Sequence, residues 1–585
     1  MYLVTAKQMR ELDRETIERL GIPAIALMEN AGRAIAEEII ALCRRQARGS
    51  AAPASAGSYE AGRYIGANGH SGANGHSGVD RYSGANGHGV ADGHSLAGDY
   101  SRADAPLKGF KVSGDEALTL DHAAAEHWLI LVGKGNNGGD GLAAARYLSE
   151  SGIAVTLVYA VPPESLTGEA ALQRDAAAAM DLSAVVYGRD RLDFAVCSGI
   201  LDALLGTGAA GAPRGAYAEL IAAANSSGKA IVSADIPSGL NADTGETHEP
   251  CIHASVTVCL AFLKRGLLQY PGAAAAGHVV VRSIGIPASL AREAGVTTYL
   301  LTPEVLRTRL DVDLSRRRSP EGHKGTYGHV LVAAGTMPMS GAGLLSARAA
   351  LRSGCGLVTW ALPQKLLPFV IGAAPELMLV PVGSSPDGTW EAGTAAELLK
   401  LSAERDVMAV GPGLGRFTGD NDWLRTLWEE TDCPLVIDAD ALNILAEQDY
   451  SCWNNRRQPV ILTPHPGEMA RLAGWSTVEV QRDRIGLALA YAQEHGVILV
   501  LKGAHTVIAT PDGQAYVNTT GHPGMGTGGA GDVLTGIISG LLAQGLKAAQ
   551  AAAFGVYLHG LAGERAAYRR HNPASLIAGD IIEEL

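Results

Sequence analysis

The sequence predicts an α/β protein whose two domains meet near residue 300. The chain has 585 residues, which is too long for a single hydrophobic core. Short apolar runs alternate with helix-like stretches, first over residues 128–281 and again over residues 329–509. Each series contains one glycine-rich loop that carries an aspartate near its end, at residues 133–141 and 526–532. Such loops let the backbone approach a ligand closely, so two nucleotide-handling domains are expected.

The composition is globular and excludes several kinds of partner. Hydrophobic residues make up 47% and charged residues 18% of the chain. The net charge of −13 argues against a nucleic-acid or membrane partner. The first residues mix both charge signs, unlike a signal peptide, and no apolar run is long enough to span a bilayer. The seven cysteines are scattered, so we expect reduced thiols in a cytoplasmic protein, without disulfides or a zinc site.

The first domain is predicted to start with two helices. Thr5 and Gln8 indicate a capping box for the first helix, Gly21 its end, and residues 24–45 the second helix. Residues 46–106 have few apolar side chains and repeat Gly-Ala-Asn-Gly-His, which predicts a flexible low-complexity insertion. A mostly parallel sheet follows. Its expected strands are residues 128–132, 153–159, 230–234, 255–262 and 279–281, with helices at 142–151 and 215–227.

The second domain repeats this alternation after a charged stretch, residues 300–319, which we expect to be a solvated linker. Its expected strands are residues 329–333, 357–361, 407–410, 435–437, 460–462, 497–501 and 506–509. Its expected helices include residues 341–353 and 441–447. Polar loops that follow parallel strands meet at one edge of the sheet, which is where ligands bind in such folds.

The first glycine-rich loop follows a predicted strand and formally matches G-x-G-x-x-G. A dinucleotide-binding Rossmann unit also needs an acidic residue after the next strand, and none follows Tyr159, so an ordinary dehydrogenase is disfavoured. Two further polar loops, at residues 202–208 and 235–245, end other strands. Together the three loops predict a ligand site.

These motifs, with Asn30-Ala31-Gly32, closely resemble the YjeF N-terminal domain, which is the NAD(P)H-hydrate epimerase. The resemblance implies a Rossmann-like α/β/α domain over residues 1–298. It implies contacts to the hydrated nucleotide from Asn136, Asn137, Gly138, Gly139, Asp140, Gly206, Thr207, Gly208, Ala209, Ala210, Gly211, Ala212 and Asp235. It further implies a potassium ion held by Asn137, Asp202 and Ser238. Asp235 is the implied catalytic residue, since epimerisation opens and recloses a C–O or C–N bond and a carboxylate can carry the proton. The alternative is that Asp235 only caps a turn.

The second glycine-rich loop opens a helix expected to begin near residue 533. Its N–H groups and helix dipole would bind an anion, and Asp532 is placed to take a proton from an attacking hydroxyl group. Polar loops at residues 411–415, 463–468 and 502–506 follow other strands, and Asp438 and Asp440 end a further strand, where they would approach a metal. The alternatives are that Asp532 is an N-cap and that His465 is only a turn residue.

These loops resemble the ribokinase-like fold, and within it the NAD(P)H-hydrate dehydratase, over residues 299–585. The resemblance implies contacts to the hydrate from Ala342, Gly413, His465 and Asp532. It implies contacts to the adenine nucleotide from Lys502, Gly503, Ala504, His505, Thr506 and Gly531. Asp532 is the implied base, and Mg²⁺ with ADP or ATP the cofactors. Resemblance to fused bacterial proteins favours ADP.

The two resemblances together imply a bifunctional enzyme that repairs NADHX and NADPHX, the hydrates of NADH and NADPH. The first half would interconvert the R and S hydrates, and the second would dehydrate the S form. We also expect a homo-oligomer. One alternative is a ribokinase-type small-molecule kinase with a non-catalytic nucleotide-binding N-terminal module, against which the loops at 463–468 and 502–506 argue. The other makes the first domain a binding module only, against which Asp235, Asn137 and Asp202 argue.

Overall fold

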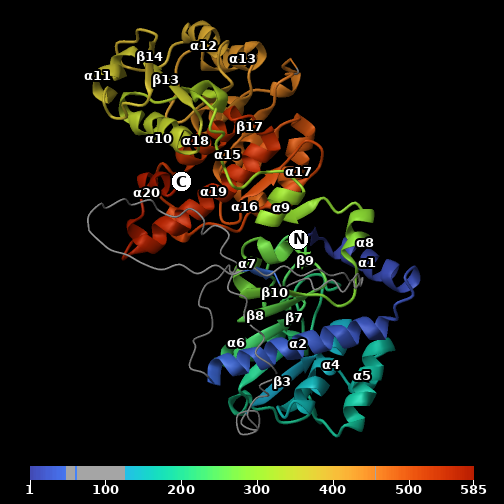
Figure 1. Ribbon diagram of the computed structural model, residues 1–585. Coiled ribbons are helices and arrows are strands. Elements are labelled where there is room, and N and C mark those ends of the chain that lie inside the picture. The colour runs from blue at the N-terminus through green and yellow to red at the C-terminus, as the bar shows by residue number, and fades with distance from the viewer. Residues whose placement is uncertain (48–58, 62–125, 455) are drawn as a thin grey trace, which may run out of the picture.

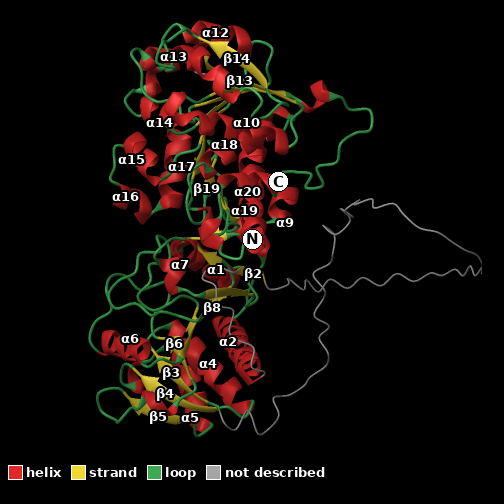
Figure 2. Ribbon diagram, turned by 90° about the vertical axis from the view of Figure 1, so that its left-hand side faces the viewer, coloured by secondary structure: helices red, strands yellow, loops and turns green. Residues whose placement is uncertain are grey.

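The computed structural model of the chain describes residues 1–47, 59–61, 126–454 and 456–585. The N-terminal and C-terminal halves are stacked one on the other, and the N-terminus lies where they meet (Figure 1). Each half is built on its own sheet, with helices on both sides (Figure 2). None of the helices in the described ranges combines the length and the apolar character needed to cross a membrane.

The first half contains an eight-stranded parallel sheet in the order β2-β10-β8-β7-β6-β3-β4-β5. The strands are β2 (Tyr59–Ala61), β3 (His127–Val132), β4 (Ala154–Tyr159), β5 (Ser183–Val186), β6 (Gly199–Ala203), β7 (Ala230–Ala234), β8 (Val256–Leu260) and β10 (His278–Arg282). The chain reverses its direction of travel across the sheet between β3 and β6, so the carboxyl ends of these two strands flank the crevice where such folds bind ligands.

Helices bury both faces of this sheet. Trp128, Ile130 and Val132 of β3 pack on the side of α2 (Ala24–Ala47), α4 (Asn136–Glu150) and α5 (Gly168–Ala179). Leu129 and Leu131 pack on the side of α6 (Ala216–Ser226). This double burial explains why the strand is a continuous apolar run. The smaller elements of this half are β1 (Leu3–Val4), α1 (Ala6–Glu18), β9 (Leu263–Lys264), α7 (Gly272–Ala275) and α8 (Ala288–Glu293).

The second half contains a ten-stranded sheet in the order β11-β20-β19-β18-β17-β16-β15-β12-β13-β14. Only the β18–β19 and β19–β20 pairs of the described strands in this sheet are antiparallel. The strands are β11 (Thr298–Leu300), β12 (His329–Ala333), β13 (Leu357–Pro363), β14 (Met378–Val382), β15 (Val407–Val410), β16 (Leu435–Ile437), β17 (Val460–Leu462), β18 (Ile498–Leu501), β19 (Val507–Ala509) and β20 (Ala515–Val517).

Two layers of helices cover the second sheet. One apolar core includes side chains of α10 (Ser340–Arg352), α18 (Ala530–Ala543), α19 (Ala548–Arg569) and α20 (Ala578–Glu583). The other includes side chains of α12 (Thr394–Ser402), α13 (Asp420–Glu430), α14 (Asp440–Leu445), α15 (Pro466–Ala473), α16 (Thr477–Arg482) and α17 (Arg484–His495). The short helices α9 (Pro303–Thr308) and α11 (Leu367–Val370) complete the half.

The two halves share a packed interface. One buried apolar cluster contains Leu3 and Leu267 from the first half together with Ile485 from the second. The Ile485 N–H donates to the Gln269 side-chain oxygen at 3.1 Å, and the Leu300 N–H donates to the Met1 carbonyl at 3.0 Å. Apolar burial and hydrogen bonds therefore join the halves directly.

The predicted alternation and the capping box of α1 are confirmed. The predicted helix starts are wrong by several residues, because α4 begins at Asn136 and α18 at Ala530, inside the glycine-rich loops. Packing overrides the weak helix propensity of glycine here. A Cβ atom on Gly138 would lie 2.1 Å from the Gly133 carbonyl oxygen, so only glycine fits at this turn.

The charged stretch before β12 is not a free linker throughout. The Arg316 guanidinium is half-buried and donates to the Ser353 carbonyl at 2.8 Å, at the C-terminal end of α10, where carbonyls lack helical partners. The predicted insertion, residues 46–106, lies outside the described residues except for 46, 47 and the strand β2. All seven cysteines are free.

Candidate active sites

A cavity of about 490 Å³ opens at the carboxyl edge of the first sheet, beside the ends of β3 and β6. It brings together eight of the residues predicted from the sequence: Asn136, Asn137, Asp140, Gly206, Thr207, Gly208, Ala209 and Asp235. Ala210, Gly211 and Ala212 are exposed on the loop that continues from this wall. Gly138 and Gly139 are buried in the first turn of α4.

Asp235 follows β7 and forms an ion pair with Lys264 of β9. The Lys264 side chain is only 1% exposed, and its ammonium group also donates to the Leu260 carbonyl at 2.7 Å. Burial alone would lower the pKa of Lys264, but the Asp235 carboxylate raises it and the net direction is upward. The Leu260 N–H of β8 donates to the Asp235 carboxylate at 3.1 Å. The carboxylate therefore interacts with Lys264 and with the neighbouring strand, and it does not cap its own turn.

Two further acids line the same cavity. Burial, followed by the nearby carboxylates of Asp235 and Asp13, raises the pKa of Asp140 well above its usual range. Burial raises the pKa of Asp13, on α1, to about 6. Lys264 and Asp13 were missed in the sequence, although a lysine directly after the apolar strand pattern at 255–262 was a usable signal.

The residues predicted to hold potassium lie behind this cavity. Asp202 is fully buried and accepts hydrogen bonds from the Ser238 N–H at 2.9 Å, the Ser238 hydroxyl at 2.5 Å and the Ser233 hydroxyl at 2.9 Å. Burial raises its pKa despite these bonds. The Asn137 amide donates to the Leu205 carbonyl at 3.0 Å, while its own oxygen is buried and no described residue donates to it. An unpaired buried oxygen beside a carbonyl fits a cation that takes oxygen ligands.

The second site lies at the start of α18. Gly529 is the N-cap of this helix, so the alternative that Asp532 is the N-cap is wrong. Asp532 stands in the first helical turn, where the N–H groups and the helix dipole favour an anion. Burial, followed by the Asp438 carboxylate, raises the pKa of Asp532 to about 7. A carboxyl group with such a pKa exchanges protons readily at neutral pH.

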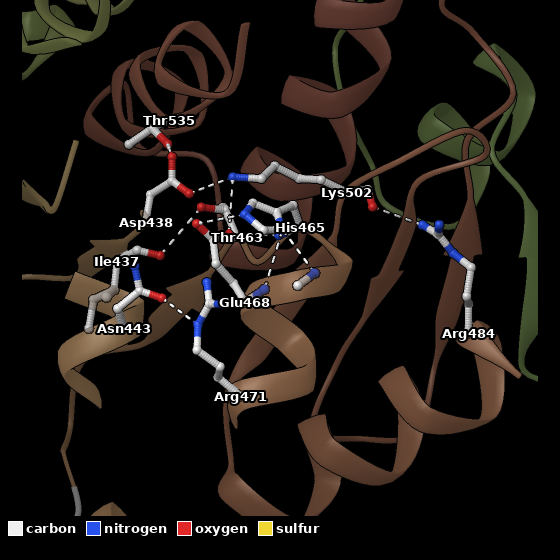
Figure 3. Close-up of polar contacts among 11 residues, drawn as sticks. Ile437, Asp438, Asn443, Thr463, His465, Glu468, Arg471, Arg484, Lys502 and Thr535 are labelled. Carbon is white, nitrogen blue, oxygen red and sulfur yellow. Dashed lines mark hydrogen bonds and ion pairs between the residues drawn. The ribbon is translucent and has the colours of Figure 1, made fainter. Parts of the chain in front are cut away.

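A partly buried lysine, Lys502, contacts the polar groups near this helix (Figure 3). The Lys502 ammonium lies 2.6 Å from Asp438 Oδ1 and 3.8 Å from Glu468 Oε2. The Thr535 hydroxyl of α18 donates to the other Asp438 oxygen at 2.6 Å. Burial alone would lower the pKa of Lys502, but the three carboxylates of Asp438, Glu468 and Asp532 raise it overall. The network therefore holds a charged lysine against the end of β16.

His465 is the N-cap of α15. The His465 ring Nδ1 accepts from the Gly467 backbone N–H at 2.9 Å. The His465 backbone N–H donates to the Glu468 carboxylate at 2.7 Å, which completes a capping box. Its side chain is 51% exposed. Burial of the remainder and the charge of Lys502 lower its pKa, which favours the neutral ring. Contact with the hydrate remains a prediction for this residue.

Some of the other predicted residues of the second site lie beside one another or beside Lys502, and the rest lie elsewhere. Gly413, at a φ of 61°, lies so close to Ala342 that a Cβ atom on it would be 3.0 Å from the Ala342 Cβ. A Cβ atom on Gly531 would be 3.4 Å from the Lys502 ammonium. His505 instead faces the first half, where its Nδ1 lies 2.9 Å from the Leu268 carbonyl. Gly503 and Ala504 are exposed, and Thr506 is half-buried.

Fold and sites together define a two-domain α/β protein with a helix N-terminus and buried acids at each site. The YjeF-related protein N-terminus family matches residues 104–266, and the NAD(P)H-hydrate dehydratase family matches residues 330–585. A bifunctional NAD(P)H-hydrate repair enzyme of Moorella thermoacetica is 38% identical over 591 residues, which cover 100% of this chain and 96% of that relative. The chain belongs to this family of bifunctional NAD(P)H-hydrate repair enzymes.

Other relatives carry the same name. The Coxiella burnetii protein is 39% identical over 80% of this chain and 91% of its own. The Escherichia coli protein is 36% identical over 81% of this chain and 87% of its own. The crystal structure of the Bacillus subtilis ADP/ATP-dependent NAD(P)H-hydrate dehydratase with ATP and Mg²⁺ is 33% identical, with a TM-score of 0.41, and covers 49% of this chain and 95% of that one.

Proposed function

We propose that this chain repairs hydrated nicotinamide nucleotides in two steps. Residues 1–298 interconvert the R and S hydrates of NADH and NADPH, and residues 299–585 use ADP or ATP to dehydrate the S form. The observation that carries the proposal is that each site combines a helix N-terminus with a carboxylate and a lysine held by an ion pair. In the first site Lys264 pairs with Asp235, and in the second Lys502 pairs with Asp438 and is attracted by the Asp532 carboxylate.

In the first site Asp235 acts on the hydrate. Epimerisation must break and remake a bond at the carbon that bears the hydroxyl group, and an ionised carboxylate can accept the proton that this releases. Lys264 forms an ion pair with Asp235 and fixes its carboxylate in place. The cavity loops at residues 136–140 and 206–212 bind the nucleotide, the first through the N–H groups of α4. Asn137, Asp202 and Ser238 would hold a potassium ion, which would offset negative charge beside the substrate.

In the second site Asp532 is the base. It takes the proton of the hydrate's hydroxyl group as the oxygen attacks the terminal phosphoryl group of the nucleotide. The phosphate ester that forms is a better leaving group than hydroxide, so elimination restores the dihydropyridine ring. Ala342, Gly413 and His465 contact the hydrate.

The adenine nucleotide lies against the N-terminus of α18 and the loop at residues 502–506, with Gly531 at the helix start. Mg²⁺ bound with the phosphate groups would offset their charge. Both oxygens of Asp438 are already bonded, to Lys502 and Thr535, so its part is to hold the lysine. We further propose ADP as the favoured nucleotide, a cytoplasmic location and a homo-oligomer.

The test uses the purified chain with separated R and S hydrates, with ADP or ATP, and with Mg²⁺ and K⁺ present or omitted. The return of dihydropyridine absorbance reports dehydration. The S hydrate should be consumed directly and the R hydrate only as fast as it is epimerised. Accumulation of a stable phosphorylated product without restored absorbance would instead support a ribokinase-type kinase with a non-catalytic first half. If the chain converts the S hydrate but not the R hydrate, the first half does not epimerise and is a binding module.

A further inference from the structure

The first cavity contains a carboxyl group that the proposed chemistry has not used. Asp13 belongs to α1, whose residues Met9, Arg10, Asp13 and Ile17 line the cavity at helical spacing. Asp235 and Lys264 line the same cavity and interact with Asp13 electrostatically. Among the described residues no donor hydrogen-bonds the Asp13 carboxyl group, so nothing in the fold employs it as a cap or a structural partner.

Inverting the carbon of a hydrate by losing and regaining its hydroxyl group needs two proton transfers. A proton must be given to the hydroxyl oxygen that leaves, and another must be taken from the water that adds to the opposite face. A carboxyl group that has donated its proton must be protonated again before it can donate a second time. A carboxylate that is already ionised can only accept a proton. Two groups in opposite protonation states on different elements meet this need.

We propose that Asp13 is the second catalytic acid–base group of this cavity, and the proposal rests on the epimerase function given above. Asp13 donates its proton to the hydroxyl oxygen, the C–O bond breaks, and water leaves with the bonding electron pair. The lone pair of the ring nitrogen forms a C=N bond. Water then adds to the other face, its oxygen forms the new C–O bond, and the C=N electrons return to nitrogen. Asp235 takes the released proton, which passes back to Asp13 through water.

The surrounding charges suit these roles. Lys264 is paired with Asp235 and keeps it as the acceptor. The charged groups that face Asp13 from other elements are Lys264, Asp235 and Asp140, and Arg10 lies on its own helix. Burial, opposed by Lys264 and assisted by Asp235, raises the pKa of Asp13 to about 6, close to the pH at which it must exchange protons. Burial and the carboxylates of Asp235 and Asp13 raise the pKa of Asp140 as well, so it adds no negative charge that would compete for the Lys264 ammonium.

The test compares Asp13→Asn and Asp13→Glu with Glu18→Gln, an exposed acid of the same helix outside the cavity. Asp13→Asn should lower kcat for R-to-S conversion by about 10²–10⁴-fold, Asp13→Glu should restore part of it, and Glu18→Gln should match the parent. Dehydration of the S hydrate should stay unchanged in all three, which reports an intact second half, while partial recovery in Asp13→Glu reports an intact first half. The parent rate should fall as pH rises above about 6, and Asp13→Asn should lose this limb.

The outcomes separate the two proposals. A parent chain that does not epimerise contradicts the epimerase function itself. A parent that epimerises while Asp13→Asn stays within threefold of it overturns the role of Asp13 alone. If the variants fail to fold, the parent chain is assayed in water labelled with heavy oxygen, which tests whether the C–O bond of the hydrate breaks during epimerisation. Incorporation of solvent oxygen into the product on the time scale of epimerisation is expected, and retention of the original oxygen contradicts the C–O step.

Discussion

Replacing Asp532 by Asn should abolish dehydration and at the same time stabilise the folded protein. The folded state raises the pKa of Asp532 from 3.8 to about 7, mainly by burial and then by the Asp438 carboxylate. The folded protein therefore holds this proton more tightly than the unfolded chain does. Stability is greatest below the unfolded pKa and is lost as pH rises towards 7, where the ionised form is held unfavourably.

The size of the effect follows from the difference between the two pKa values. A tenfold difference in proton affinity corresponds to about 1.4 kcal/mol, so the ionised carboxylate lowers the free energy of unfolding by up to about 4 kcal/mol above pH 7. Asn has nearly the same shape and no charge. The Asp532→Asn variant should therefore gain about 1.5 kcal/mol at pH 5, where the unfolded carboxyl group is already ionised, and about 4 kcal/mol at pH 8, as expected where a strained active site trades stability for activity.

The assay is thermal or urea unfolding of the parent and the variant at pH 5 and pH 8, with S-hydrate dehydration measured on the same samples. Asp387→Asn provides the control, because Asp387 is an exposed acid of the same half. Dehydration should fall by about 10²–10⁴-fold in the Asp532 variant and not in the control. A variant that is no more stable than the parent at pH 8, or one that retains activity within a few fold, refutes the reasoning.

Three other changes test the rest of the molecule. Asp235→Asn should stop R-to-S conversion while S-hydrate dehydration continues, because the second site shares none of its groups. Asn137→Ala removes the unpaired buried oxygen and should abolish the K⁺ dependence of epimerisation, measured by titrating KCl against a sodium control. Gln269→Ala leaves the Ile485 N–H and the Asp243 carbonyl without their partner and should cost about 1–3 kcal/mol in urea unfolding.

Each of these has a clear contrary result. Near-normal epimerisation by the Asp235 variant removes that residue from the chemistry. An unchanged K⁺ response in the Asn137 variant places the ion elsewhere. For Gln269, the matched control is Gln448→Ala, a residue of the second half away from the interface. Equal stability of the two glutamine variants would mean that the interface hydrogen bonds add nothing to the apolar packing between the halves.

Much of the fold could be predicted because local patterns coincide with tertiary burial. The strands β7, β12, β15, β16 and β17 have the expected bounds, since each is a short apolar run buried on both faces. The starts of α4 and α18 could not be predicted in this way. Their glycines disfavour a helix locally, and only the close approach of Gly138 to the Gly133 carbonyl shows why the helix starts there.

The site residues also divide into those that a local sequence pattern marks and those that only the tertiary structure identifies. Asp235 and Asp532 stand in loop motifs that the sequence displays; Asp235 lines the first cavity, and Asp532 stands in the first turn of α18. Lys264 and Asp13 stand in ordinary strand and helix patterns. A lysine near the end of a strand pattern marks Lys264 as a candidate, but the partners of Lys264 and Asp13 lie far away in the sequence, so no local pattern identifies their contacts. Asp438 was expected to approach a metal and not to pair with Lys502, because that pairing joins the ends of two strands.

The segment from Lys264 to Tyr270 links the two sites physically. Lys264 pairs with Asp235 in the first cavity, and four residues later the Leu268 carbonyl meets His505, in the loop proposed to bind the nucleotide. Gln269 then bonds to Ile485. An extended chain of four residues spans at most about 14 Å, so the Asp235–Lys264 pair and the contact to the loop at residues 502–506 lie on one short segment. A flexible tether between independent domains would not hold the two sites at such a fixed separation.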